Sequence, residues 1–180
     1  MKFEIYSEAK CRDVRINGDT WCRLEAVANE CRYTFFPSNV PSEYGGAAGE
    51  GEIEGKILCG TQEIAMKCLE ALAELIENGY SEPMRWLVAL DMGDIMACVF
   101  NGSTMQYLHC GNISEKTAEL AKLPNGTAVM FASFCLTAEE KSASFCETFL
   151  EQICPDSCES VWWQLSACEY GAAAVDIWYR

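Results

Sequence analysis

The chain has 180 residues, of which 27 are acidic and 13 basic, so its formal net charge at neutral pH is −14. A surface this acidic repels the phosphates of nucleic acids and anionic membranes, and it attracts basic proteins. We therefore expect a basic protein partner and neither a nucleic acid nor a membrane as a direct partner. Half of the residues are hydrophobic, which is enough for a sizeable core and excludes a disordered chain.

The negative charge is unevenly distributed along the sequence. Residues 1–35 hold six acidic and six basic residues, whereas residues 36–180 hold the other 21 acidic residues and only seven basic ones. The second part therefore carries the whole net charge. We expect any acidic surface that binds a basic partner to lie on this part of the chain.

The length predicts a single domain over residues 1–180. No apolar run is long enough to span a bilayer, and Glu4 and Glu8 stand where a signal peptide would need its apolar segment. A cytoplasmic location is therefore predicted. Most of the twelve cysteines stand beside apolar residues, which is typical of free thiols in the core of a protein from a reducing compartment.

Period-two alternation of apolar and polar residues predicts antiparallel strands in the first part of the chain. Each such strand has one buried face and one solvated face, and Asn17-Gly18 favours a turn between two of them. The pattern predicts a four-stranded β-meander within residues 1–36. The residues expected to point inward are Phe3, Ile5, Val14, Ile16, Cys22, Leu24, Ala26, Cys31, Tyr33 and Phe35.

A loop rich in glycine and proline at residues 37–52 separates the meander from a mixed α/β part at residues 53–180, and these two parts are candidate subdomains. In the second part, apolar periodicity, Asn-Gly turn sequences and helix-capping residues indicate where helices and strands begin and end. Capping by Thr137 and Glu140 predicts the start of its last helix. In chain order we expect a strand at 56–59, a helix at 62–78, a strand at 86–90, a hairpin with strands at 95–100 and 104–108, a short helix at 114–122, a strand at 128–135, a helix at 138–153 and strands at 161–167 and 173–179.

The order of these elements predicts an α+β fold: an N-terminal antiparallel β-meander followed by a mixed sheet with two main helices and one short helix. On the helix at 62–78, an apolar stripe of Ile64, Cys68, Leu72 and Ile76 is expected to face the core. The acidic residues off this stripe point to solvent in this prediction, and only Lys67 offsets them.

Acidic and aromatic residues define a predicted interaction surface. Exposed carboxylates on the two main helices would attract a basic partner, and tryptophans on the last two strands are candidate anchors, because alternation turns one residue of each aromatic pair outward. The residues of this predicted surface are Glu70, Glu74, Glu77, Glu140, Glu147, Glu151, Trp162 and Trp178.

In size and charge the chain resembles phage anti-restriction and anti-CRISPR proteins and bacterial immunity proteins. This resemblance implies an inhibitor that occupies the basic groove in which a nucleic-acid-binding protein holds phosphates. The first functional hypothesis is therefore a small acidic cytoplasmic antagonist, from a prokaryote or a phage, of a basic nucleic-acid-binding partner.

The second hypothesis is a cysteine hydrolase with a Cys135/His109 pair. His109 is the only histidine and ends one predicted strand, and Cys135 ends the next long one. An imidazole beside a thiol can activate it as a nucleophile. The layout resembles that of caspase-like peptidases, which place His-Gly after one strand and Cys after the next, although here Cys110 separates His109 from Gly111.

Other polar motifs predict no cofactor and no metal. Asp91 and Asp94 follow a predicted strand, where two carboxylates can hold Mg²⁺, but no further carboxylate is expected nearby, so an acidic turn is predicted. Cys154 and Cys158 form one closely spaced pair, whereas structural zinc sites need a second pair or histidines. The sequence alone does not decide whether Cys154 and Cys158 bind a metal.

Overall fold

The computed structural model describes residues 9–42, 51–80, 86–88, 90–113, 118, 121–137, 142–167 and 173–180. The fold is α+β, as predicted, with two main helices and one short helix among the described elements. The strands are β1 (Lys10–Ile16), β2 (Asp19–Val27), β3 (Glu30–Phe35), β4 (Ile53–Leu58), β5 (Trp86–Val88), β6 (Thr104–Gly111), β7 (Val129–Leu136), β8 (Ser160–Ala167) and β9 (Ala174–Tyr179). The helices are the 3-10 helix η1 (Pro37–Asn39), α1 (Gln62–Tyr80), α2 (Met92–Cys98) and α4 (Ala143–Ile153).

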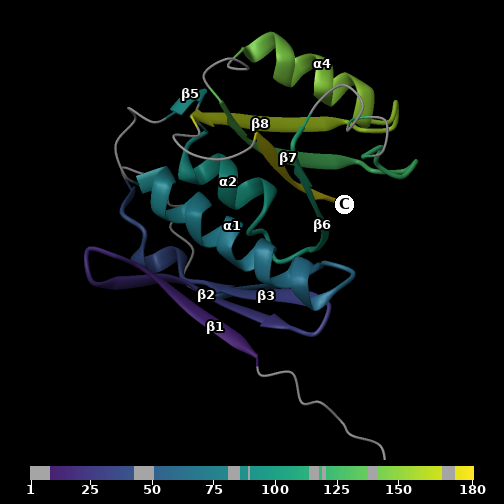
Figure 1. The fold of residues 1–180 in the computed structure, drawn as a ribbon. Coiled ribbons are helices and arrows are strands. Elements are labelled where there is room, and N and C mark those ends of the chain that lie inside the picture. Colours follow the sequence, from purple (N-terminus) through teal and green to yellow (C-terminus); the bar gives the residue numbers. More distant parts are fainter. Residues whose placement is uncertain are drawn as a thin grey trace, which may run out of the picture.

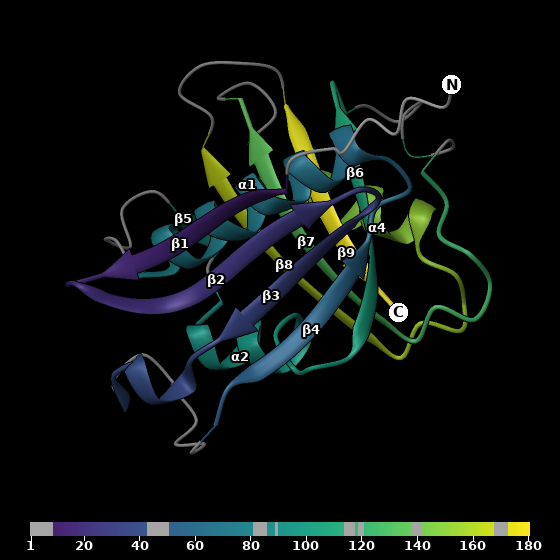
Figure 2. The same ribbon diagram turned by 90° about the horizontal axis from the view of Figure 1, so that it is seen from below.

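All nine described strands form one mixed sheet in the order β1-β2-β3-β4-β6-β9-β7-β8-β5. The strands β1 to β4 are antiparallel, β4 pairs with β6 in parallel, and β9 lies antiparallel between β6 and β7. The sheet folds over, so that β1, β2 and β3 lie across from β7 and β8 (Figure 1). Seen from below, β1 to β4 lie side by side (Figure 2).

The helices α1 and α2 lie between the two halves of this folded sheet, and α4 covers the far face of β7 and β8 (Figure 1). One core therefore fills the space around α1 and α2, and a second core lies under α4. The predicted stripe of α1 is confirmed at Cys68, Leu72 and Ile76, which are fully buried. Ala65, Leu69, Ala73 and Leu75 are buried as well, because a helix between two sheet layers needs more than one apolar face.

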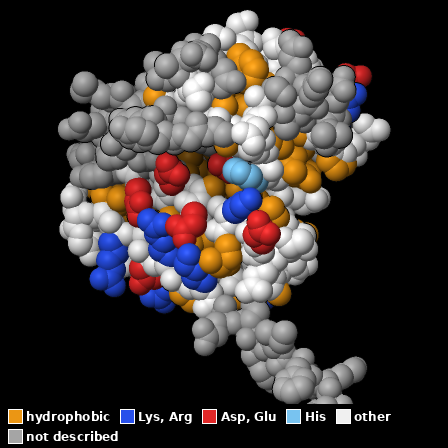
Figure 3. Space-filling model, in the orientation of Figure 1, with side chains coloured by type: hydrophobic (Ala, Val, Ile, Leu, Met, Phe, Trp, Pro, Cys, Tyr) orange, Lys and Arg blue, Asp and Glu red, His pale blue; other side chains and the backbone are white. Residues whose placement is uncertain are grey.

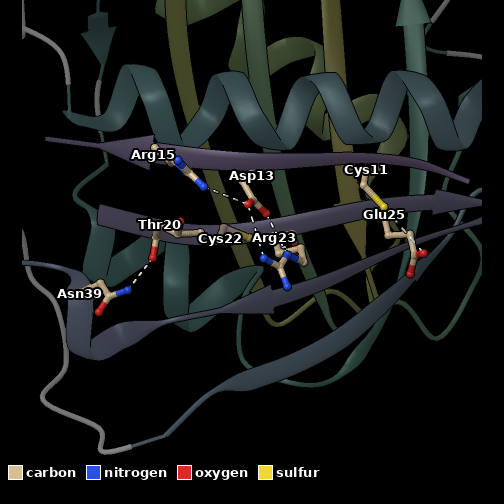
Figure 4. Close-up of polar contacts among 8 residues, drawn as sticks. All are labelled: Cys11, Asp13, Arg15, Thr20, Cys22, Arg23, Glu25 and Asn39. Atoms are coloured by element: carbon tan, nitrogen blue, oxygen red, sulfur yellow. Dashed lines mark hydrogen bonds and ion pairs between the residues drawn. The ribbon is translucent and has the colours of Figure 1, made fainter. Parts of the chain in front are cut away.

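The predicted meander is confirmed over β1, β2 and β3, whose expected inward residues are buried. The first of its four predicted strands, with Phe3 and Ile5, lies outside the described residues. The opposite face carries polar contacts, among them a hydrogen bond of 2.8 Å from Arg23 Nε to Asp13 Oδ1 (Figure 4). Asn39 of η1 donates to the backbone carbonyl of Thr20 at 2.6 Å. Alternation alone therefore predicted both faces correctly.

The predicted hairpin at 95–108 is wrong in its first strand, because Met92–Cys98 forms the helix α2. Asp91 is the N-cap of this helix, and its side chain accepts a hydrogen bond of 2.8 Å from the backbone N–H of Asp94. The two aspartates thus start a helix rather than form the predicted acidic turn. The residues of α2 that are at least partly exposed are Gly93, Asp94 and Ala97, so this helix has too few polar side chains to show the polar stripe that reveals a surface helix.

The last helix begins later than predicted. Ser142 is the N-cap of α4 and its Oγ accepts a hydrogen bond of 3.0 Å from the backbone N–H of Phe145, so the predicted start at residue 138 is wrong. The inward residues of α4 are buried as expected. Glu140 and most of the predicted short helix at 114–122 lie outside the described residues. Among the described helices, none is long and apolar enough to cross a membrane.

Seven of the described cysteines are buried free thiols, in agreement with the predicted core role: Cys22, Cys31, Cys59, Cys68, Cys98, Cys110 and Cys146. Burial raises the pKa of Cys22 and Cys68 well above the ordinary value, so neither forms a reactive thiolate near neutral pH. Cys135 is disulfide-bonded and is therefore an exception to the predicted free thiols.

Candidate functional site

A cluster of three polar side chains lies where β6 and β9 pair. His109 stands directly opposite Asp176 in the antiparallel register, so both side chains project from the same face of the sheet. His109 Nδ1 lies 2.8 Å from Asp176 Oδ1, and the hydroxyl of Tyr107 donates to the same oxygen at 2.5 Å. Burial raises the pKa of Tyr107 and the carboxylate of Asp176 raises it further, so the phenol stays a hydrogen-bond donor.

This His109–Asp176–Tyr107 cluster forms the floor of a cavity of 420 Å³ beneath α1. Met66 and Ala71 of α1 contribute apolar lining, and acidic residues of the same helix stand around the opening. The only histidine of the chain is visible at the surface in Figure 3, with basic and acidic side chains around it. The cavity therefore combines an imidazole, carboxylates and a small apolar wall.

The predicted Cys135/His109 pair is not brought together. Cys135 stands opposite Ala174 on β9, and Ala174 stands opposite Gly111 on β6, so β9 separates Cys135 from His109. Two strand spacings amount to about 10 Å. The imidazole bonds to Asp176 instead, and the disulfide leaves Cys135 without a thiol. The hydrolase hypothesis stays a prediction. It requires that Cys135 be reduced and that the two side chains come closer than this register places them.

Two of the predicted surface carboxylates on α1 are paired with bases of β1. Glu70 accepts hydrogen bonds from Lys10 Nζ at 2.8 Å and from Arg12, and Glu77 accepts one from Arg12 at 2.7 Å. The expectation that only Lys67 offsets these acids is therefore wrong. The face that α1 presents beside β1 carries both signs of charge, and Figure 3 shows them intermingled.

We expect replacement of Glu70 by Gln to lower stability at pH 7 by less than about 1 kcal/mol, because the ion pairs are half exposed. The hydrogen bond from Lys10, with the charge of Arg12, lowers the pKa of Glu70. Its stabilising effect is thus complete above the ordinary pKa of Glu and is lost as the pH falls through the lowered folded value. The difference in melting temperature between wild type and variant should accordingly vanish in acid.

The matched control for this pH effect is Glu147→Gln, because Glu147 forms no ion pair with a described basic residue. Melting temperatures at pH 7 and pH 3 would be compared for both variants. If the two variants behave alike at both pH values, the ion pairs of Glu70 do not stabilise the fold.

A second candidate site follows α4 into β8. Glu147, Glu151, Asp156 and Glu159 are exposed, and within the described part of the chain none of them forms an ion pair. The next residues along the chain include Val161 and Trp162, which are 42% and 37% exposed. We call these six residues the α4–β8 surface.

The α4–β8 surface includes a stretch of strand edge that no described strand covers. Among the described strands, only β5 borders β8 on the side away from β7, and it pairs with β8 only at Leu165 and Ser166. The part of β8 that carries Val161 and Trp162 pairs with β7 on one side and has no described strand on the other. Unpaired edges with exposed apolar side chains are places where other chains bind.

The prediction that Trp178 is an exposed anchor is wrong, because its side chain is fully buried between Tyr107 and Phe131. Of the remaining predicted surface residues, Glu74 is exposed and lines the cavity beneath α1. The two final strands thus differ: one presents a tryptophan to solvent and the other contributes one to the core.

Sequence reasoning did not identify Tyr107 or Asp176 as site residues. One signal was available, because Asp176 alternates with Val175 and Ile177 and therefore shares a face with Trp178. A carboxylate on the inward face of an apolar strand is costly unless it has partners, which is the usual mark of a functional or network residue.

Comparisons with known proteins add little. No family model matches the chain, and no curated protein matches it. Two structures of FtsZ from M. jannaschii are similar to it, an empty FtsZ dimer with a TM-score of 0.47 and a tryptophan-to-tyrosine mutant with a TM-score of 0.43. Each is 16% identical to this chain and covers 66% of it, whereas the chain spans only 37% of each FtsZ chain. At this level of similarity neither a shared fold nor a shared function follows.

Proposed function

We propose that this protein binds a basic, nucleic-acid-binding protein in the cytoplasm through the α4–β8 surface and acts as its inhibitor or antagonist. The observation that carries the proposal is the group of four exposed carboxylates with no described basic partner, followed in the chain by two exposed apolar residues at a strand edge that no described strand covers. The chemical requirements are a partner with clustered Lys or Arg side chains and an apolar pocket or strand.

The pairing pattern of the carboxylates favours this surface over α1. On α1, Glu70 and Glu77 already bond to Lys10 and Arg12, so a basic partner would have to compete with those bonds. On the α4–β8 surface a partner's cations meet carboxylates that form no ion pair with a described basic residue. Unpaired carboxylates of this kind attract a basic protein over several ångströms and increase its rate of association.

Val161 and Trp162 provide apolar contacts that slow dissociation, which exposed charges alone do not. Charges at the rim of an interface mainly change the association rate, whereas buried aromatic anchors determine how slowly the complex dissociates. Val161 and Trp162 follow the acidic segment that ends at Glu159, but alternation puts Val161 on the α4 face of the sheet and Trp162 on the opposite face. A partner that contacts the carboxylates and Trp162 together must therefore reach around the edge of β8. The role as an antagonist of an anti-defence or immunity kind is supported by size and charge only.

The proposal is tested with a partner captured from a prokaryotic lysate at low salt and then purified. Its affinity for this protein should fall steeply as salt is raised from 50 to about 500 mM, because screening weakens exposed charge pairs. Trp162→Ser should raise the dissociation rate and leave the salt dependence unchanged. A partner whose affinity is insensitive to salt and to this substitution would refute the proposed surface.

A further inference from the structure

We propose that the cavity between α1 and the strands β6 and β9 binds a small organic cation, an alkylammonium or alkylguanidinium, which donates hydrogen bonds to His109 and Asp176. This site goes beyond the proposed function and is separate from it. His109 and Asp176 share a face of the sheet with Tyr107, which belongs to the core around α1, whereas α4 packs on the other face. A ligand in the cavity would thus not touch the α4–β8 surface.

The floor of the cavity offers hydrogen-bond acceptors. Since the carboxylate of Asp176 accepts, Nδ1 of His109 carries a proton, and Nε2 is an acceptor when the imidazole is in its neutral form. The bonds from His109 and Tyr107 both end on Oδ1 of Asp176, and no other described side chain bonds to Oδ2. Tyr107 has already donated its only hydroxyl proton. A ligand that satisfies this floor must therefore bring N–H or O–H donors.

The charge around the cavity selects a cationic donor. Asp176 lies on the floor, and Glu63, Glu70 and Glu74 of α1 stand at the opening. The described cations beside these four carboxylates are Lys67 and the two bases that bond to Glu70, Lys10 and Arg12. Lys67 itself lies 3.6 Å from Glu63, which offsets its charge. The field in the cavity is therefore negative, and an anion of the same size would be repelled. An ammonium or guanidinium group provides several donors and the opposite charge.

The shape of the cavity suits an alkyl chain attached to that cation. Met66 and Ala71 of α1 line one wall. On the strand side, Gly111 leaves the space next to the imidazole open, since a methyl group at this position would lie 3.7 Å from Nε2. A volume of 420 Å³ lies within the usual range for small-molecule sites, which begins at roughly 300 Å³.

The test is a titration of the full chain with n-butylguanidinium chloride, in which NMR monitors the imidazole C–H resonances. These resonances come from one residue, because His109 is the only histidine in the sequence. A saturable shift is expected. Asp176→Asn should weaken binding by at least about tenfold, since a charge-assisted hydrogen bond is lost. Gly111→Val should weaken it as well by filling the space beside Nε2, without removing an acceptor.

Three controls keep the test decisive. Sodium butyrate and n-butanol at matched ionic strength have alkyl chains of similar length, with a carboxylate or a hydroxyl in place of the guanidinium, and they should give no saturable shift. Glu147→Gln, which removes a carboxylate far from the cavity, should leave the affinity for n-butylguanidinium unchanged. If butyrate or butanol binds as well as the cation, or if Asp176→Asn and Gly111→Val bind it like the wild type, the proposal is wrong. Gly111→Val decides the matter if Asp176→Asn does not fold.

Discussion

Replacement of Gly55 by alanine should destabilise the protein by about 3 kcal/mol, the largest effect that we expect from a single added methyl group. Gly55 of β4 stands opposite Tyr33 of β3, and the phenol ring lies across it. A Cβ at position 55 would lie 2.3 Å from the hydroxyl oxygen of Tyr33 and 2.4 Å from Cζ, which is far inside contact distance. Either the ring or the strand must move.

Tyr33 has no room to move cheaply. Its hydroxyl donates to the carbonyl of Val99 at 3.1 Å and accepts from the N–H of Gly102 at 3.1 Å, and its ring packs edge-on against Phe100 with centroids 5.0 Å apart. These contacts join the meander to the end of α2. A displaced Tyr33 would lose them and leave buried polar groups without partners.

Urea denaturation of Gly55→Ala and of Gly51→Ala measures this effect with a matched control. Gly51 has no atom within 4 Å of an added Cβ, so its substitution should be nearly neutral. In a background with Tyr33→Leu, Gly55→Ala should cost much less, because the clashing hydroxyl and ring carbon are absent. Equal costs at positions 51 and 55 would show that the ring does not lie across Gly55 in solution.

The parts of the fold that the sequence predicted are those set by local patterns. Alternation along 13–35 is a property of each strand by itself, and it correctly identified which side of β1, β2 and β3 is buried. The same approach failed at α2, where Ile95, Cys98 and Val99 are all buried. The exposed side of α2 consists of Gly93, Asp94 and Ala97, so only one polar side chain marks it and the helical period cannot be read from hydrophobicity.

The candidate site depends on long-range pairing, which one sequence does not contain. The contact of His109 with Asp176 follows from the register of two strands that are 67 residues apart in the chain. The pairing of Glu70 with Lys10 and Arg12 likewise joins the acidic second part of the sequence to its balanced first part. For this reason the charge segregation along the sequence is only partly preserved on the surface.

Reversal of two charges on the α4–β8 surface, Glu147→Lys with Glu151→Lys, should weaken binding of the basic partner on the order of 100-fold at low salt. Two attractive contacts become repulsive, and the loss should appear mainly in the association rate. Both residues are exposed on α4, so each substitution should change the free energy of unfolding by no more than about 0.5 kcal/mol. The melting temperature should therefore change little. Stopped-flow association kinetics at two salt concentrations would measure the effect.

The control for this reversal makes the same change of charge elsewhere. Asp19 and Glu52 are exposed in the half of the sheet formed by β1 to β4, and their joint replacement by Lys alters the net charge equally. If the partner recognises only overall acidity, both double variants should slow association alike. If it recognises the α4–β8 surface, only the variant of Glu147 and Glu151 should do so.

The central claim is that this acidic protein occupies the surface on which its partner holds nucleic acid, and competition tests it most directly. Labelled protein bound to the purified partner would be titrated with the partner's own DNA or RNA, at fixed ionic strength. The account predicts complete displacement, with the Glu147→Lys/Glu151→Lys variant displaced at lower nucleic-acid concentrations than the wild type. A stable ternary complex, in which the partner holds the nucleic acid and this protein at once, would contradict it.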